Sequence, residues 1–291
     1  MPELPEVETL RRSFLKSGPA HPSLVGLKIL RSDLGWRRTL AAPGPRIFAR
    51  RIHGQTVTDV SRRGKLLLFR LSGAVLISHL RMSGGWVLHR QSTPRPDYCR
   101  LSLQLNSGWR LSFRDPRKFG RIWLLDDAGE LLGRLGPEPL APAFTADLFR
   151  RRLAARRRRL KPLLLDQSFL AGLGNIYVDE ALHRARLHPL TLSHQLDRPA
   201  GVALWRGIRQ VLREAIRYRG TSFDGVYTGG RYLERLRVYR RTGCACATCQ
   251  ARIQRILVAQ RGTHICPHCQ PAPALRPGEP PAQDLRRPAE R

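Results

Sequence analysis

Short apolar runs separated by turn residues fill the first half of the chain. Within residues 25–127 the clearest runs lie at 65–71, 74–80, 100–105, 109–114 and 121–125. Runs of this length, bounded by Ser-Gly, Asn-Ser-Gly and Asp-Pro, are typical of β-strands. The pattern therefore predicts a β-rich domain, a sandwich or a barrel.

Helical patterns precede and follow this region. Residues 2–14 predict an amphipathic helix, because Pro5 suits its first turn and the acidic Glu6 and Glu8 suit the positive end of its dipole. The stretch 135–143 is rich in proline and predicts a linker. Beyond it, the pattern favours helices over 146–159, 178–186 and 200–218.

The charge of the chain limits its partners. Lys and Arg number 52 against 22 acidic residues, a net charge of +30. Such an excess indicates a polyanionic partner, with nucleic acid as the first candidate and an anionic membrane as the second. Apolar runs near 18 residues and Trp-rich amphipathic helices are lacking, so the membrane is disfavoured. The N-terminus does not resemble a secretory signal, and we expect a cytoplasmic, nucleoid-associated bacterial protein.

Five of the six cysteines lie between positions 244 and 269. Two Cys-x-x-Cys pairs, sixteen residues apart, have the spacing of a structural four-thiolate zinc site; they are Cys246, Cys249, Cys266 and Cys269. Cys244 competes with Cys246 for the first pair, and His264 and His268 are weaker alternatives. A closed site of this kind leaves no open position for catalysis, so any chemistry must lie elsewhere.

Several further residues suit nucleic-acid binding, although each has a plainer interpretation. The run 150–161 holds seven Arg and one Lys, and is either a phosphate-binding helix or a solvated one. Asn175 follows Gly-Leu-Gly and can cap a helix whose N-terminus binds anions, or simply end a turn. Arg261 and Thr263, on the cysteine hairpin, are candidate phosphate contacts.

Two loops of the β-rich region carry apolar tips beside cations. Met82 lies in loop 80–85 and Phe119 in loop 114–120, as expected of a wedge that opens a base stack. The alternative for Phe119 is a place in the core. Lys65 begins an apolar run, and periodicity does not decide between an exposed strand lysine and a phosphate ligand.

Eight motifs occur together in one order. They are PELPEVET (2–9), RRGKLLL (62–68), HLRMSG (79–84), DPRKFG (115–120), LGPEPL (135–140), KPLLLDQ (161–167), GLGNIYVDEAL (172–182) and the cysteine hairpin with QRGTHICPHCQ (260–270). In these motifs the chain resembles the bacterial formamidopyrimidine-DNA glycosylases, which remove 8-oxoguanine and ring-opened purines from DNA.

The resemblance implies an α+β fold in several parts. These are a β-sandwich catalytic domain with an N-terminal helix (2–134), a linker (135–143), a helix–two-turn–helix DNA-binding domain (144–237) and a four-cysteine zinc finger with one structural Zn²⁺ (238–270). Composition predicts a disordered basic tail at 271–291. The implied partner is damaged double-stranded DNA, bound by a monomer.

The resemblance also implies the chemistry and its residues. Pro2, freed of Met1, would be the nucleophile of a bifunctional glycosylase and AP lyase that cuts by β,δ-elimination through a Schiff base. Glu3 would be the general acid and base, Glu6 a second acid near the lesion, and Lys65 and Arg261 would assist strand cleavage. The implied DNA contacts are Met82, Tyr98, Arg117, Phe119, Arg156 and Asn175, with a looser alignment at Tyr98 and Arg156.

This sequence departs from the family pattern in four places. Arg81 stands where glycine is usual, Lys118 replaces a common arginine, and Tyr98 replaces a frequent histidine. The loop 221–235, which covers the extruded purine in the family, falls short of the glycine-rich stretch often found there. This loop therefore bears on which lesions are recognised.

Three other interpretations compete with this one. An endonuclease VIII-like enzyme for oxidised pyrimidines shares most motifs, but Asp-Pro-Arg-Lys-Phe-Gly and the loop 220–224 favour the purine enzyme. A non-catalytic zinc-finger DNA-binding protein would lack Pro2, Glu3 or Lys65, and all are present. An RNA- or ribosome-binding protein explains the charge alone.

Overall fold

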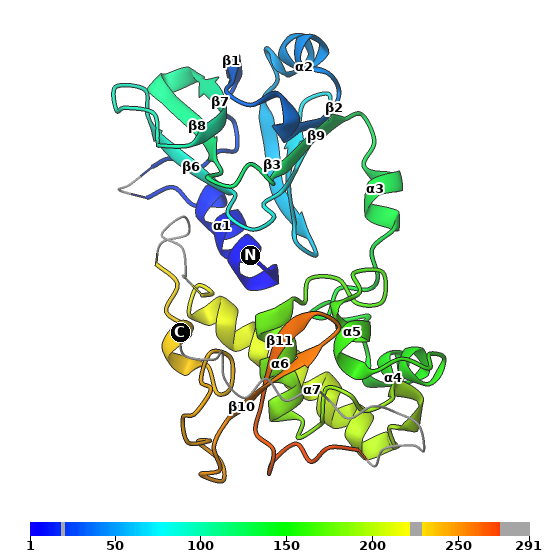
Figure 1. Ribbon diagram of the computed structural model, residues 1–291. Helices are drawn as coiled ribbons and strands as arrows, with labels where there is room; N and C mark the ends of the chain where they lie inside the picture. The colour runs from blue at the N-terminus through cyan, green and yellow to red at the C-terminus, as the bar shows by residue number, and fades with distance from the viewer. Residues whose placement is uncertain (19–20, 222–228, 274–291) are drawn as a thin grey trace. The chain divides into compact units, whose positions relative to one another are not determined.

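The chain forms two compact units in the computed structural model (Figure 1). The structure describes residues 1–18, 21–221 and 229–273. Unit 1 comprises Met1–Arg134 with Tyr218–Arg231, and unit 2 comprises Leu135–Arg217 with the chain from Tyr232 onward. Most of the expected tail at 271–291, and the centre of the loop 221–235, lie outside the described residues. No helix in the described part of the chain is long and apolar enough to cross a membrane.

Unit 1 contains two β-sheets with helices beside them. The four-stranded sheet has the order β1 (Ile29–Leu34), β7 (Cys99–Leu105), β8 (Trp109–Arg114), β6 (Gly85–Arg90). The five-stranded sheet has the order β2 (Leu40–Ala42), β9 (Arg121–Leu125), β5 (Val75–His79), β4 (Leu66–Leu71), β3 (Val57–Arg63). All neighbours are antiparallel except β2 and β9. The helices are α1 (Leu4–Leu15), α2 (Pro45–Ile52) and α3 (Gly129–Gly133).

A chain of aromatic rings marks the core of unit 1. Phe14 of α1 packs on Phe69 of β4, with ring centroids 6.0 Å apart. Phe69 meets Trp86 of β6 at 5.4 Å, and Trp86 meets Phe113 of β8 at 5.1 Å. Because these rings come from α1 and from both sheets, the core lies between the sheets and fixes α1 against them.

The strand predictions are confirmed at all five apolar runs, with ends that differ by at most one residue. The pattern did not reveal β3, because a register shift between Val57 and Asp59 interrupts its alternation. It also missed α2, which buries only Phe48 and Ile52, one helical turn apart.

Unit 2 contains four α-helices and a hairpin among its described residues. They are α4 (Ala146–Ala154), α5 (Leu160–Leu165), α6 (Asn175–Arg184), α7 (Arg198–Arg217) and the strands β10 (Gln254–Val258) and β11 (Arg261–Ile265). Helix α7 packs against α4 and α6, and β11 packs against α6. The hairpin therefore rests on the most buried helix of this unit.

The predicted helix over 146–159 is wrong at its end. Helix α4 stops at Ala154, and the following residues pair with another loop. The Arg158 carbonyl accepts from Ser193 N–H at 2.9 Å, and Leu160 N–H donates to the Thr191 carbonyl at 2.9 Å. Residues 156–159 of the basic run therefore lie outside any helix, because hydrogen bonds to another loop hold the backbone there.

Candidate active site and nucleic-acid interface

The chain begins at the positive end of α1. Glu3 is the N-cap of this helix and forms a capping box with Glu6, whose Oε2 accepts from Glu3 N–H at 2.8 Å. Both carboxyl groups are buried, whereas Pro2 is half-buried. The predicted helix start is confirmed, and it holds Pro2 and Glu3 next to each other at a fixed place.

The other oxygen of Glu6 holds a loop from far along the chain. Glu6 Oε1 accepts from Thr221 N–H at 2.8 Å and from Thr221 Oγ1 at 3.1 Å. Gly220 has φ +73°, and a Cβ there would lie 2.4 Å from Glu6 Oε1, so only glycine fits. With both oxygens accepting hydrogen bonds, Glu6 positions the start of this loop beside the terminus.

Glu8 joins α1 to the turn that carries Lys65. Its carboxylate binds Arg11 and Arg12 at 2.9 and 2.7 Å, and Arg62 at 3.3 Å. Arg62 also donates to the Gly64 carbonyl at 3.0 Å, and Lys65 follows as a buried residue between β3 and β4. The sequence analysis assigned Glu8 only to the helix dipole. Arginines three and four residues after Glu8 were the sequence signal that could have predicted its ion pairs.

Glu8 is expected to make stability depend on pH in acid. Burial raises the pKa of Glu8, but Arg11, Arg12 and Arg62 outweigh this and hold it at about 2, against an ordinary 4.5. Because the folded pKa is the lower one, the stabilisation, up to about 3 kcal/mol, is present above pH 4.5 and is lost as pH falls toward 2.

Urea unfolding of Glu8→Gln across this pH range tests the assignment. The variant should be less stable at pH 7, and its stability should change less than that of wild type between pH 5 and 2. Glu130→Gln is the matched control, because the Glu130–Arg134 pair is exposed and contributes little. Equal pH profiles for wild type and Glu8→Gln would contradict the prediction.

Asp115 joins the two loops whose tips carry Met82 and Phe119. This fully buried carboxylate accepts from Ser83 Oγ at 2.6 Å and from Gly120 N–H at 2.7 Å. Arg117 N–H donates in turn to Ser83 Oγ at 3.3 Å. A third segment joins them, since Asp115 N–H donates to the Tyr98 carbonyl at 3.0 Å. The structure thus brings together all four unit 1 residues that the sequence assigned to DNA contact.

The tips of these loops face solvent. Phe119 is 49% exposed and Tyr98 is 55% exposed, so the interpretation of Phe119 as a core residue is wrong. The Arg117 guanidinium lies 5.1 Å from the Phe119 ring centroid, a cation beside an apolar tip. A cavity of about 320 Å³, here called the terminal pocket, is lined by Met1, Arg81, Met82, Phe119 and Arg121.

Three residues of α6, spaced four apart, contact the cysteine hairpin. We call Asn175, Asp179 and His183 the α6 row. Asn175 Nδ2 donates to the Gly262 carbonyl at 3.0 Å, Asp179 Oδ2 accepts from His264 N–H at 2.9 Å, and His183 Nε2 lies 3.5 Å from Cys246 Sγ. The predicted capping role of Asn175 is wrong: Gly174 is the N-cap, and Asn175 binds the hairpin instead.

A buried ion pair supports the middle of this row. Lys161 Nζ lies 2.6 Å from Asp179 Oδ1, and both side chains are fully buried. Lys161 also reaches the Gly262 carbonyl at 3.4 Å. The sequence did not reveal this pair; the only signal was a lysine inside the apolar run of α5. The side chain of His264 approaches Asp179 at 3.4 Å, so this histidine is not among the clustered ligands.

Breaking this pair is expected to destabilise the protein strongly. Asp179→Asn leaves the Lys161 cation buried beside a neutral amide, at a cost of about 3–5 kcal/mol in the free energy of unfolding. The double variant Lys161→Met/Asp179→Asn should recover most of this loss, because it removes the buried charge and keeps the acceptor for His264 N–H.

Urea unfolding of the metal-loaded protein measures both variants. Asp147→Asn, which breaks the exposed Arg150–Asp147 pair, is the control and should cost less than about 1 kcal/mol. A loss for Asp179→Asn no larger than that of the control would contradict the prediction.

Four thiols meet at the base of the hairpin. The sulfurs of Cys246, Cys249, Cys266 and Cys269 all lie within 4.8 Å of one another, and the closest pairs are 3.4–3.9 Å apart. Sulfurs bound at about 2.3 Å around a tetrahedral ion lie about 3.8 Å apart, so the set fits a zinc-like ion. Burial raises the pKa of Cys246, but hydrogen bonds from Thr248 N–H and His183 lower it to about 5, which favours the thiolate.

The remaining hairpin residues divide into exposed and buried ones. Cys244 is exposed and lies outside the cluster. Arg261 begins β11 with its side chain exposed, directly after a tight turn in which Ala259 and Gln260 have φ +47° and +59°. Thr263 is buried and donates to the Arg261 carbonyl at 3.0 Å, so the expectation that it contacts phosphate is wrong.

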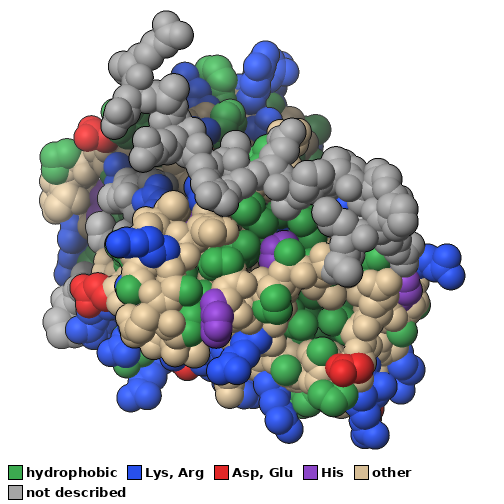
Figure 2. All heavy atoms as spheres, turned by 60° about the horizontal axis from the view of Figure 1, so that its bottom comes forward, with side chains coloured by type: hydrophobic (Ala, Val, Ile, Leu, Met, Phe, Trp, Pro, Cys, Tyr) green, Lys and Arg blue, Asp and Glu red, His purple; other side chains and the backbone are tan. Residues whose placement is uncertain are grey.

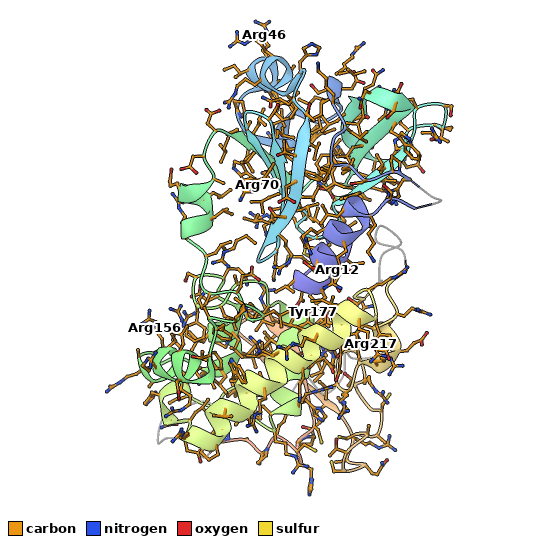
Figure 3. The ribbon with its side chains drawn as sticks, turned by 180° about the vertical axis from the view of Figure 1, so that it is seen from behind. Arg12, Arg46, Arg70, Arg156, Tyr177 and Arg217 are labelled. Carbon is orange, nitrogen blue, oxygen red and sulfur yellow. The ribbon has the colours of Figure 1, made fainter. Side chains whose placement is uncertain are left out.

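Arg156 follows the end of α4 and is exposed (Figure 3). Its carbonyl accepts from Ser193 Oγ, which fixes the backbone of this part of the basic run. On the face drawn in Figure 2, Lys and Arg side chains are spread along the edges and acidic ones are few. Charge alone therefore does not locate a nucleic-acid site on this face.

Three stretches of the chain match family models. Residues 1–122 match the formamidopyrimidine-DNA glycosylase N-terminal domain, 135–225 match the H2TH domain of the same enzymes, and 243–272 match the zinc finger found in FPG and IleRS. The chain belongs to the formamidopyrimidine-DNA glycosylase family. Its α+β fold, with the two-sheet domain, the helical domain and the four-cysteine hairpin, is the fold of that family.

Relatives within the family cover nearly the whole chain. The formamidopyrimidine-DNA glycosylase of Protochlamydia amoebophila is 43% identical over 281 residues, which span 93% of this chain and 99% of that protein. Two solved structures, each with TM-score 0.85 and 38% identity, cover 93% of this chain and 100% of theirs. One is MutM with DNA containing carbocyclic 8-oxo-G, and the other is Lactococcus lactis FPG (MutM) with DNA containing FAPY-dG.

Proposed function

We propose that this chain is a bifunctional DNA glycosylase and AP lyase of base excision repair that acts on oxidised purines in double-stranded DNA. The observation that carries the proposal is the terminus: Pro2 stands at the start of α1, next to the buried Glu3, in a chain of the glycosylase family. Relatives solved with 8-oxo-G and FAPY-dG support purine lesions as the substrate class.

The first step forms a bond between protein and sugar. Removal of Met1 leaves Pro2 with a secondary amine, whose lone pair attacks C1′ of the damaged nucleotide. The bond from C1′ to the base breaks, and the base leaves with a proton supplied by an acid, for which we propose Glu3. Ring opening of the sugar then gives an iminium ion, a Schiff base between Pro2 and C1′.

The second step cuts the strand. The iminium cation acidifies the C2′–H bond, so a base removes that proton and the 3′ phosphate leaves; a second elimination releases the 5′ phosphate. Water then hydrolyses the iminium and frees Pro2. Lys65, in the turn tied to α1 through Arg62 and Glu8, is proposed to bind phosphate during these steps, as is Arg261 of the hairpin.

The joined loops of unit 1 suit the opening of the base stack. An enzyme that attacks C1′ must first extrude the nucleotide, and an inserted apolar side chain fills the gap. Met82 and Phe119 are the proposed wedges, with Arg117 and Tyr98 beside them. Asn175 and Arg156 of unit 2 are the proposed contacts to the DNA backbone.

The ion that we propose for the four thiols is Zn²⁺, in a structural role. With four protein ligands it has no open position and takes no part in bond breaking. Its function is to hold the base of the hairpin, whose other end carries Arg261. We further propose that the protein acts as a monomer in the bacterial cytoplasm, at the nucleoid.

Borohydride trapping on lesion-containing duplexes tests the function. A covalent complex is expected on 8-oxoguanine opposite cytosine, with faster cleavage than on thymine glycol. Faster processing of thymine glycol would favour an endonuclease VIII-like enzyme instead. Tight binding to damaged DNA without a trapped complex would favour a non-catalytic DNA-binding protein.

A further inference from the structure

Arg81 has a backbone conformation that its side chain disfavours. Its φ is +54°, in the left-handed region that glycine adopts readily and that residues with a Cβ atom disfavour. The loop imposes this conformation, because Arg81 N–H donates to His79 Nδ1 at 3.0 Å and Gly84 N–H donates to the Leu80 carbonyl at 2.9 Å. An unfavourable conformation held by its surroundings is a reason to look for a function of the side chain.

The guanidinium of Arg81 is exposed at the terminal pocket. Met1, Met82, Phe119 and Arg121 are its other lining residues. Arg121 Nη1 donates to the Arg38 carbonyl at 2.7 Å, so part of that guanidinium is committed to backbone. Within the part of the chain that the structure describes, the Arg81 side chain has no ion pair or hydrogen bond. The pocket thus combines apolar tips, the chain terminus and one uncommitted cation.

The charges of two cations, Arg81 and Lys65, act on His79. Burial, and then the charges of Arg81 and Lys65, lower the pKa of His79 to about 3, so this ring is neutral at pH 7. Because His79 Nδ1 accepts from Arg81 N–H, the ring proton resides on Nε2, which is a donor. Arg81 and the Nε2–H of His79 are therefore neighbouring donors, which suits an anionic ligand.

We propose that Arg81 is an additional phosphate-binding residue of the lesion site, and that its guanidinium binds a backbone phosphate beside the extruded nucleotide. The inference rests on the proposed function. The plainer alternative is one more solvated arginine in a chain with 52 Lys and Arg residues. What distinguishes Arg81 from that background is its place in the terminal pocket, next to the wedge residues Met82 and Phe119.

The test compares Arg81→Gly with a matched control. Arg186→Gly also removes an exposed arginine from a left-handed position, with φ +56°, but in unit 2 at the end of α6. Both variants should keep or raise Tm, because glycine relieves the backbone. Binding to a duplex with a tetrahydrofuran abasic analogue, which is not cleaved, is measured against salt concentration for wild type, both variants and Arg81→Lys.

The expected result is specific to Arg81→Gly. The slope of log affinity against log salt should become shallower by about 0.9, with roughly tenfold weaker binding at low salt, while Arg81→Lys keeps the slope and Arg186→Gly changes neither. An unchanged slope for Arg81→Gly, or equal changes in Arg81→Gly and Arg186→Gly, would overturn the inference.

A second measurement identifies the phosphate. Methylphosphonates, which lack the charge, are placed one at a time around the abasic analogue. At one position wild type should lose about tenfold in affinity while Arg81→Gly loses little further. Equal losses for the two proteins at every position would overturn the inference about Arg81 but not the proposed function. Wild type that does not prefer the abasic duplex to an undamaged one would overturn the proposed function and this inference with it.

Discussion

Protein that retains Met1 is expected to bind the tetrahydrofuran duplex like mature protein and to cut 8-oxoguanine DNA at least about 10³-fold more slowly. In that form the nitrogen of Pro2 is an amide, whose lone pair is delocalised and is no nucleophile. Binding should persist, because the wedge loops and the metal hairpin do not involve this nitrogen.

Two preparations of one sequence test this without any substitution. Protein made while methionine aminopeptidase is inhibited keeps Met1, and later treatment with the purified peptidase removes it, as mass spectrometry verifies. Single-turnover cleavage and borohydride trapping should appear only after treatment. Equal cleavage before and after removal of Met1 would exclude Pro2 as the nucleophile. Glu3→Gln in mature protein should also slow cleavage, but with binding intact.

Removing the metal is expected to weaken binding to damaged DNA by at least about 100-fold while unit 1 stays folded. Without an ion the four cysteine side chains lose the bonds that hold them together, and the base of the hairpin opens. The Gly262 carbonyl, which Asn175 and Lys161 hold, and the neighbouring Arg261 then lose their places. The core of unit 1 has no part in this cluster.

Chelation of the full chain, followed by readdition of Zn²⁺, measures the effect. Near-ultraviolet circular dichroism follows the tryptophans, four of which, among five, lie in unit 1, and fluorescence anisotropy follows DNA binding. Cys249→Ser should behave like chelated protein, whereas Cys244→Ser should retain both metal and binding, because Cys244 is exposed outside the cluster. Tight binding by the metal-free protein would show that the hairpin does not hold the DNA.

The sequence predicted features that depend on neighbours along the chain. Short apolar runs bounded by turn residues predicted β4, β5, β7, β8 and β9, and the two Cys-x-x-Cys pairs identified the four clustered thiols. In both cases the information is local: an apolar run and its flanking turn residues define a strand, and each cysteine pair forms a tight turn by itself.

Features that depend on distant partners were missed or misjudged. Asp115 and Glu8 gain distant hydrogen-bond partners only in the folded chain. Ser83 donates to Asp115, and Arg62 donates to Glu8. Asn175 was expected to cap its helix, but its side-chain amide donates to the Gly262 carbonyl of the hairpin instead. The end of α4 was predicted too late in the chain, because the backbone of the basic run forms hydrogen bonds with the loop at Thr191 and Ser193. Local spacing does not encode which remote group satisfies a side chain.

The hydrogen bonds of Asp115 have a consequence for how damage is found. Because one buried carboxylate fastens both loops, Met82 and Phe119 are held in one fixed arrangement, and in the function that we propose they enter the base stack together. The conformational entropy of arranging these two side chains is lost when the protein folds, and it is not lost again at each base pair that the protein contacts. The two side chains then have the same geometry at every base pair, so the ease with which the DNA deforms decides where they insert.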